Sequence, residues 1–140
     1  VGVKINGKPR YISSDVYFDD FTKIYLNDRV VISKNVVFLS HDYSLTTAMI
    51  SLSKKPETDI AFVKDIIIGN NVFIGLGAII MPGTIVNDNV VVGAGTVLRG
   101  EIPSNSVVIG NPSKVIGKLS DKAEKWRRNM SESELIIDKY

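Results

Sequence analysis

The side chain in this sequence best suited to proton transfer is its single histidine, His41, which stands beside Asp42 in the segment FLSHDYS. A neutral imidazole can take a proton from a weak nucleophile such as a hydroxyl group, and a general base of this kind contributes roughly 100- to 10,000-fold in rate. A lone histidine next to an aspartate in a loop is, however, more often an ordinary surface residue. The residue type alone therefore leaves both interpretations of His41 open.

The composition argues against several other kinds of chemistry and partner. The 140 residues include no cysteine, so the chain has no thiol nucleophile, no disulfide and no cysteine metal ligand. One histidine also argues against a three-histidine zinc site, and we expect no metal. The formal charge of +2, without a dense Lys/Arg cluster before the C-terminal tail, argues against nucleic acid as a partner. No apolar run is long enough for a membrane span, so we expect a soluble, cytoplasmic protein.

The elements that must position His41 follow from a six-residue period in the segment from Ile66 to Gly100. Two columns of this period are aliphatic or small: Ile68, Ile74, Ile80, Val86, Val92 and Leu98, and, four residues further on, Val72, Ala78, Thr84, Val90, Thr96 and Ile102. A period of six fits neither a helix nor a long strand, but it fits short strands joined by tight corners rich in Gly and Asn. Three such strands make one triangular coil, and stacked coils form a parallel β-helix with an apolar ladder inside.

The same phase is visible upstream, from Leu26 to Phe38, and a looser first coil precedes it. The period is lost over about residues 43–64, which predicts a loop extruded from one corner of the stack. We therefore expect a β-helix domain over residues 1–119 that carries this loop.

A helical tail is expected over residues 120–140, where Ser120 or Asp121 is a candidate N-cap. Further along, Ser131 and Glu134 have the spacing of a capping box. A helix here would cover the open end of the coils or pack on a neighbouring chain, because the bare end of a β-helix exposes unpaired backbone groups.

Four motifs in this order resemble a known family: FLSHDYS with its histidine, IGNNVFIG after the insertion, the hexapeptide run, and the closing VVIGNPSKVIG. Together they are similar to the left-handed β-helix hexapeptide-repeat acyltransferases, in the galactoside, maltose and capsule-sugar O-acetyltransferase branch. The resemblance covers about residues 10–119. It implies an all-β fold, a left-handed parallel β-helix with an extruded loop and a short C-terminal helix.

The resemblance also implies a function. Members of that family are homotrimers with active sites between chains, and they use acetyl-CoA as the acyl donor. His41 matches the family's general base, so the resemblance implies direct transfer of an acetyl group to the hydroxyl of a sugar or saccharide acceptor, possibly in surface-polysaccharide biosynthesis.

The acetyl-CoA site is assigned by the same resemblance. Residues matching the edge that holds the pantetheine arm are Phe73, Gly75, Leu76, Ala94 and Gly95, and those near the nucleotide end are Arg99 and Lys114. The glycines have an equally good structural explanation, since the corners of a tight coil need small residues. Lys114 lies in GNPSKVI, which matches the family's closing motif, whereas the RGE around Arg99 departs from the family's usual Thr-Lys-Asp.

The acceptor site is less well defined by the sequence. Asp19 and Asp20 in YFDDF lie one coil before His41 and can accept hydrogen bonds from sugar hydroxyls, while Tyr17 and Tyr43 offer apolar faces to a sugar ring. An ordinary surface role explains these four residues equally well. Two other functions therefore stay open: an N-acetyltransferase acting on an amino sugar or antibiotic, and a β-helix scaffold without catalysis.

Overall fold

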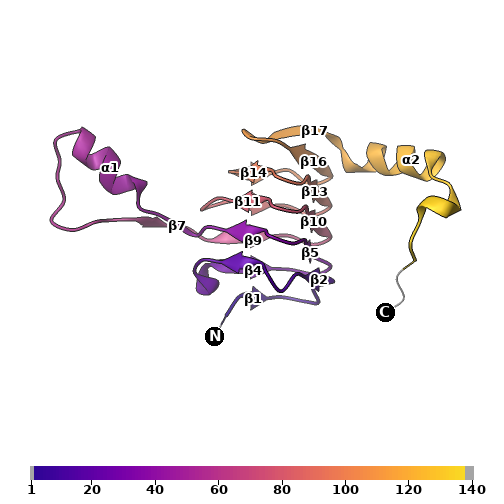
Figure 1. Ribbon diagram of the computed structural model, residues 1–140, viewed down its shortest axis with the longest axis horizontal. Coiled ribbons are helices and arrows are strands. Elements are labelled where there is room, and N and C mark those ends of the chain that lie inside the picture. Colours follow the sequence, from indigo (N-terminus) through magenta and orange to yellow (C-terminus); the bar gives the residue numbers. More distant parts are fainter. Residues whose placement is uncertain (1, 138–140) are drawn as a thin grey trace.

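The computed structural model describes residues 2–137 and shows a stack of short parallel strands from which one arm and one tail project (Figure 1). Strands of successive coils pair to form three sheets. The first sheet contains β1 (Lys4–Ile5), β4 (Ile24–Leu26), β9 (Ile66–Ile68), β12 (Ile85–Val86) and β15 (Glu101–Ile102). The second contains β2 (Tyr11–Ile12), β5 (Val31–Ile32), β10 (Val72–Ile74), β13 (Val90–Val92), β16 (Ser106–Ile109) and β17 (Lys114–Lys118). The third contains β3 (Tyr17–Phe18), β6 (Val37–Phe38), β11 (Ile79–Ile80) and β14 (Val97–Leu98).

The inward side chains of these strands build the core that the six-residue period predicts. Val72 pairs with Val90, and Ile80 with Leu98, so one coil consists of three hexapeptides. Every member of the two predicted columns is at most 5% exposed, which confirms their inward orientation. Two members are polar, and the hydroxyl of Thr84 donates to the Met81 carbonyl oxygen at 2.6 Å, so its burial leaves no unpaired group.

The corners use residues that tolerate a positive φ. Asn71 and Asn89 have φ of 53° and 58° between the first and second sheets, and Gly77 and Gly95 have φ of 69° and 68° between the second and third. Asparagine and glycine reach this left-handed region at low cost. The alternation of Asn-rich and Gly-rich turns in the sequence therefore marks successive corners of the same coil.

The coil is regular in its middle and irregular at both ends. In the first coil Tyr17 pairs with Val37, a longer step than in the central coils. After Gly100 the step becomes shorter, because Val86 pairs with Ile102. The coil that ends here therefore has fewer residues in its corners than the central coils.

The extruded segment is an arm that leaves the stack after the third sheet (Figure 1). Its base is an antiparallel pair, β7 (His41–Asp42) and β8 (Phe62–Val63), and its tip carries the helix α1 (Ser44–Ser51). The Thr46 hydroxyl ties the helix to the returning chain, because it accepts a hydrogen bond from the Ile60 amide at 2.8 Å. The predicted loop therefore has secondary structure of its own.

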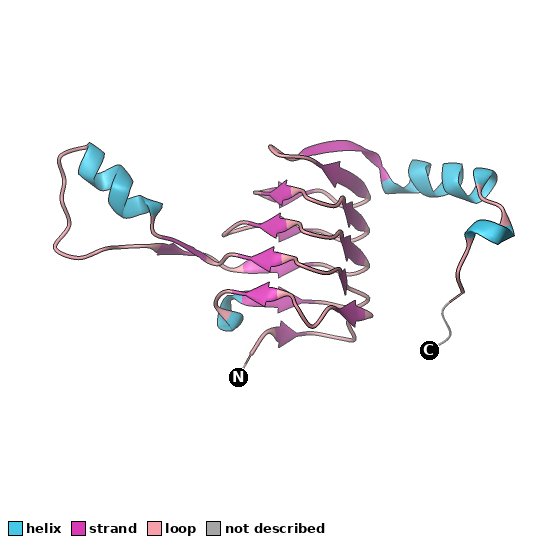
Figure 2. Cartoon of the chain, viewed as in Figure 1, coloured by secondary structure: helices cyan, strands magenta, loops and turns pink. Residues whose placement is uncertain are grey.

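The C-terminal end of the stack is closed by a strand. β17 turns back antiparallel to β16, and α2 (Leu119–Asn129) then extends sideways from the stack (Figures 1 and 2). Of the two positions expected for this helix, covering the open end is wrong, because β17 pairs with the edge of β16 instead, and packing on a neighbouring chain stays a prediction. The expected N-cap is also wrong, since the cap residue is Lys118.

The capping box is confirmed at Ser131 and Glu134, around the short helix η2 (Glu132–Glu134). Another short helix, η1 (Phe21–Lys23), follows β3 near the arm. The tail expected over residues 120–140 extends past the described residues. Within residues 2–137 no helix combines the length and apolar character that a bilayer crossing requires.

Candidate active site

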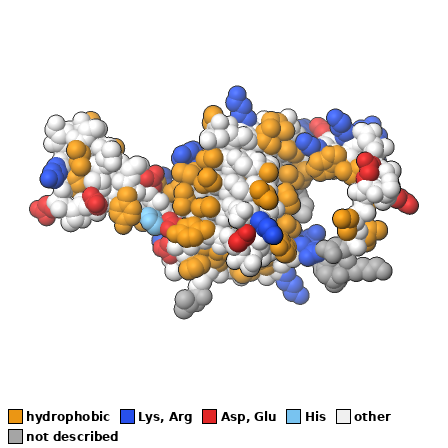
Figure 3. Space-filling model, in the orientation of Figure 1, with side chains coloured by type: hydrophobic (Ala, Val, Ile, Leu, Met, Phe, Trp, Pro, Cys, Tyr) orange, Lys and Arg blue, Asp and Glu red, His pale blue; other side chains and the backbone are white. Residues whose placement is uncertain are grey.

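His41 lies at the junction between the coil stack and the arm. It is the first residue of β7, and Figure 3 shows the histidine in pale blue between the two parts of the molecule. The β-helix fixes the chain up to this point, since Leu39 donates its amide to the Ile80 carbonyl oxygen at 2.9 Å. The imidazole is therefore held on a rigid support, with 35% of its side chain exposed.

Asp19 of the first coil holds the imidazole. Its Oδ2 atom lies 2.6 Å from Nδ1 of His41, and the Asp19 side chain is only 11% exposed. The same oxygen accepts hydrogen bonds from the amides of Ser40, at 3.2 Å, and His41, at 3.4 Å. A carboxylate on Nδ1 places the proton of the neutral imidazole on that nitrogen, so the lone pair is on Nε2. The contact therefore fixes the orientation of the imidazole ring.

Ser40 connects the two strand ends that carry this pair. It is fully buried, and its hydroxyl oxygen accepts a hydrogen bond from the Asp20 amide at 3.1 Å. The Asp20 side chain accepts from the amide and hydroxyl of Thr22, at 2.9 and 2.7 Å, and these hydrogen bonds lower the pKa of Asp20. Asp20 thus caps η1, and its Oδ1 atom is already engaged.

The two tyrosines predicted for the acceptor site are placed differently. Tyr43 meets His41 edge to face, with ring centroids 5.5 Å apart, and is 58% exposed. Tyr17 is 55% exposed on the outer face of the third sheet, where it pairs with Val37. Tyr43 is therefore the tyrosine in direct contact with His41.

Arg99 and Asp42 add charge next to the histidine. Hydrogen bonds from Ser44 lower the pKa of Asp42, and the positive charge of Arg99 lowers it further. The Ser44 amide donates to Asp42 Oδ1 at 2.8 Å. Arg99 directly follows β14 of the third sheet, the sheet from which the arm leaves. It therefore belongs electrostatically to the histidine end of the site.

The residues predicted for the pantetheine arm gather at another corner. Leu76, Ala94 and Gly95 are neighbours between the second and third sheets, where the Gly95 amide donates to the Leu76 carbonyl oxygen at 2.8 Å. Leu76 is 54% exposed. Within one chain the third sheet lies between this corner and His41, so the two sets of predicted residues are apart.

The structure also places three other residues predicted to bind acetyl-CoA, namely Gly75, Phe73 and Lys114. A Cβ at Gly75 would lie 2.6 Å from the Ala94 nitrogen, so close packing of adjacent coils requires this glycine. Phe73 is 41% exposed on the outer face of the second sheet. Lys114 is the exposed first residue of β17, opposite Ile109.

The chemistry that this geometry supports is general base catalysis. Among residues 2–137 no group of three or more His, Cys, Asp or Glu side chains is arranged to hold a metal ion. The Asp19–His41 pair has the geometry of a base with an orienting carboxylate, an arrangement that can activate a hydroxyl. Sequence reasoning missed Ser40, and its only signal was its position directly before His41.

Comparison with known proteins identifies the fold. The family model for the hexapeptide repeat of succinyl-transferase matches residues 65–99. A provisionally named lipopolysaccharide biosynthesis O-acetyl transferase, WbbJ of Escherichia coli (strain K12), is 28% identical in an alignment of 140 positions that covers 91% of this chain and 71% of that protein. Protein CapG of Staphylococcus aureus is 38% identical over 121 residues, 85% of this chain and 67% of CapG. A solved galactoside acetyltransferase in complex with coenzyme A has a TM-score of 0.64 at 25% identity, covering 86% of this chain and 67% of that one.

The coil and its repeat define a left-handed parallel β-helix of the hexapeptide type. The chain belongs to the hexapeptide-repeat acyltransferase family, in the sugar O-acetyltransferase branch that its motifs resemble. It spans 71% of the first relative above and only about half of several others that it matches.

Proposed function

We propose that this chain is a cytoplasmic, acetyl-CoA-dependent O-acetyltransferase in which His41 is the general base and a sugar hydroxyl is the acceptor. The observation that carries the proposal is the 2.6 Å contact between Asp19 Oδ2 and His41 Nδ1. It orients the imidazole and leaves Nε2 as the proton acceptor. The galactoside acetyltransferase with bound coenzyme A supports both the donor and the acceptor class.

In the proposed reaction Nε2 of His41 takes the proton of the acceptor hydroxyl as its oxygen attacks the thioester carbonyl carbon. The tetrahedral intermediate collapses with cleavage of the carbon–sulfur bond, and the proton on Nε2 passes to the departing thiolate of coenzyme A. The carboxylate of Asp19 stabilises the imidazolium that exists between these steps. A backbone N–H at a glycine-rich corner is the expected donor to the oxyanion.

We further propose a homotrimer with each active site between two chains. The support is that His41 and the corner of Leu76, Ala94 and Gly95 are separated by the third sheet in one chain, so a second chain can bring the two together. Outer sheet faces also expose apolar side chains, with Phe73 41% and Tyr11 50% exposed. Analytical ultracentrifugation tests this assembly, and a monomer at micromolar concentration contradicts it.

The acceptor site is proposed around Tyr43, which contacts the imidazole edge to face, with Tyr17 and Asp20 at its margin. Asp19 is assigned to the histidine instead, because its Oδ2 atom is occupied by three contacts. A role in surface-polysaccharide biosynthesis is supported by the name of the WbbJ relative.

The experiment that tests the proposal compares wild type with His41→Ala. We expect both proteins to bind acetyl-CoA in calorimetric titration, and only wild type to release coenzyme A when sugars are added as acceptors. The expected loss of kcat is roughly 100- to 10,000-fold, the range of general base catalysis. Full turnover by His41→Ala rules out the assigned base, and no binding of acetyl-CoA by wild type supports the scaffold alternative. Amino sugars in the same screen test the N-acetyltransferase alternative.

A further inference from the structure

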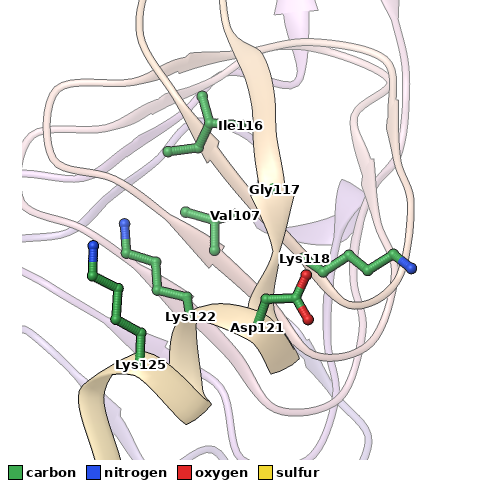
Figure 4. A pocket seen from close by; sticks show the side chains of 7 residues that line it. All are labelled: Val107, Ile116, Gly117, Lys118, Asp121, Lys122 and Lys125. Atoms are coloured by element: carbon green, nitrogen blue, oxygen red, sulfur yellow. The ribbon is translucent and has the colours of Figure 1, made fainter. Parts of the chain in front are cut away.

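The helix α2 projects from the coil stack and leaves most of its surface uncovered (Figure 1). Figure 4 shows the side of the helix that faces the stack, with Lys122 and Lys125 pointing the same way. Together with Val107 of β16 and Ile116 of β17, these lysines line a hollow of about 350 Å³. No residue of α2 itself is buried, so the other sides of the helix are open to a partner.

Another side of α2 carries an apolar stripe. At 3.6 residues per turn, Leu119, Ala123 and Trp126 lie within about 60° of one another around the helix axis. Met130 continues the stripe, because its amide still donates to the Trp126 carbonyl oxygen at 3.0 Å. Trp126 is 41% and Met130 48% exposed. The segment that follows adds three more exposed aliphatic side chains: Leu135, Ile136 and Ile137.

Basic side chains border this stripe. Lys122 lies on one border and Arg127 on the other, whereas Asp121 and Glu124 lie on the opposite side of the helix. Residues 118–130 contain five basic and two acidic side chains, although the formal charge of the whole chain is only +2. Within residues 2–137, Arg127 is the one cation of this segment that forms an ion pair, with Glu124 at 2.8 Å. The exposed stripe is therefore set in positive charge.

An apolar stripe with a tryptophan, bordered by Lys and Arg on an otherwise polar helix, is typical of helices that lie in the interface of a bilayer. We propose that α2 docks on a membrane surface that contains anionic lipids. Trp126 and Met130 enter the interface, and Lys122 and Arg127 meet the headgroup phosphates. A second copy of the same stripe suits this site less well, because the bordering cations of the two copies would face each other.

The proposed homotrimer strengthens such docking. Threefold symmetry places the three copies of α2 at the same height along its axis, so that all three can meet one flat surface, and linked contacts bind more tightly than single ones. Docking would bring the enzyme to saccharides carried on lipids. This biological meaning rests on the proposed function, whereas membrane binding itself can be measured whether or not acetyl transfer is found.

The chain contains its own reporter for this docking. Trp126 is the only tryptophan, it is partly exposed, and the Lys122 Nζ atom lies 5.6 Å from the centroid of its ring. We expect its emission to shift to the blue, and its quenching by acrylamide to fall, on titration with vesicles of phosphatidylcholine and phosphatidylglycerol in equal amounts. Vesicles of phosphatidylcholine alone should have little effect, and salt should weaken the response. An emission that the anionic vesicles leave unchanged overturns the proposal.

Two double variants test the two parts of the surface, with vesicle flotation as the measure of binding. Lys122→Gln/Arg127→Gln should weaken binding about 30-fold, the effect of two cations near an anionic surface. Its control of equal charge change, Lys54→Gln/Lys55→Gln in the segment that follows α1, should bind as wild type does.

Trp126→Ser/Met130→Ser should weaken binding at least about tenfold, because the apolar contact is lost. Its control is Ile50→Ser/Leu52→Ser on the arm, where the two side chains are 51% and 64% exposed. Wild-type binding by either variant of α2 overturns the proposal, as does an equal loss in a control. Thermal unfolding confirms that each variant is folded.

A neighbouring chain as the true occupant gives a different result. The trimer would then dissociate in analytical ultracentrifugation of Trp126→Ser/Met130→Ser, and vesicles would not bind wild type. Under the membrane proposal this variant keeps the assembly state of wild type and releases coenzyme A at the wild-type rate with a soluble acceptor, since neither residue belongs to the proposed active site. If no acetyl transfer is found, the proposed function fails and the vesicle titrations still decide this proposal.

Discussion

Replacing Asp19 by asparagine tests the central feature of the site, because the change keeps the size of the side chain and removes its charge. In the native structure one oxygen of Asp19 contacts His41 Nδ1 at 2.6 Å and the amides of Ser40 and His41 at 3.2 and 3.4 Å. An amide oxygen can keep part of these contacts. It cannot stabilise the imidazolium formed during proton transfer as a carboxylate does.

The expected magnitude follows from the contact that is weakened. A hydrogen bond to a charged group contributes about 1.5–3 kcal/mol. If this contribution is made mainly in the transition state, kcat falls roughly 10- to 150-fold, because each 1.36 kcal/mol corresponds to a factor of ten. KM for acetyl-CoA stays close to the wild-type value, since Asp19 has no proposed contact with the donor.

The assay is steady-state release of coenzyme A with an acceptor found by screening, together with a thermal unfolding curve to confirm that the variant is folded. The matched control is Asp42→Asn, which changes the carboxylate directly after His41 whose oxygen accepts from the Ser44 amide at 2.8 Å. A kcat for Asp19→Asn within twofold of wild type refutes the reasoning. An equal loss in Asp42→Asn shows that general electrostatics, and not orientation by Asp19, supports the reaction.

Two further predictions concern the stability of the coil stack. Gly75→Ala places a Cβ 2.6 Å from the Ala94 nitrogen and 2.8 Å from the Gly93 carbonyl carbon, so we expect a loss of about 1–3 kcal/mol in urea unfolding. Gly117→Ala, where the added carbon meets open space, serves as the control and changes stability little. Asp15 accepts hydrogen bonds from the Ser13 hydroxyl at 2.7 Å and the Asn35 amide at 3.2 Å, and these lower its pKa below the ordinary value of 3.8. A lowered pKa in the folded state stabilises the protein above that ordinary value, and the contribution is lost as the pH falls through the folded-state pKa. Asp15→Asn is therefore less stable than wild type at pH 7, and a difference that fails to shrink at acidic pH contradicts the assignment.

The sequence by itself determined the architecture of the coil. A period of six with two aliphatic columns predicts a stack of three-stranded coils with both columns inside. Residues of these columns, such as Ile74 and Val90, are indeed fully buried. The extruded segment could also be located, because the loss of the period is itself a signal. Local information is sufficient here, since each inward position depends on the repeat and not on a distant partner.

Only the tertiary structure decided which residue holds His41. Asp19 is 22 positions before His41, and the sequence suggested it for the acceptor. The pairing depends on the first coil, where Tyr17 aligns with Val37, and that coil departs from the regular spacing. Its register therefore cannot be counted from the central repeat. The direction of α2 could not be predicted from the sequence for a similar reason. The helix starts directly after β17, so its direction depends on the antiparallel pairing of β17 with β16. The six-residue period therefore predicts which side chains of the coils point inward. Contacts between irregular segments, such as that of Asp19 with His41, depend on where the folded stack places the ends of those segments.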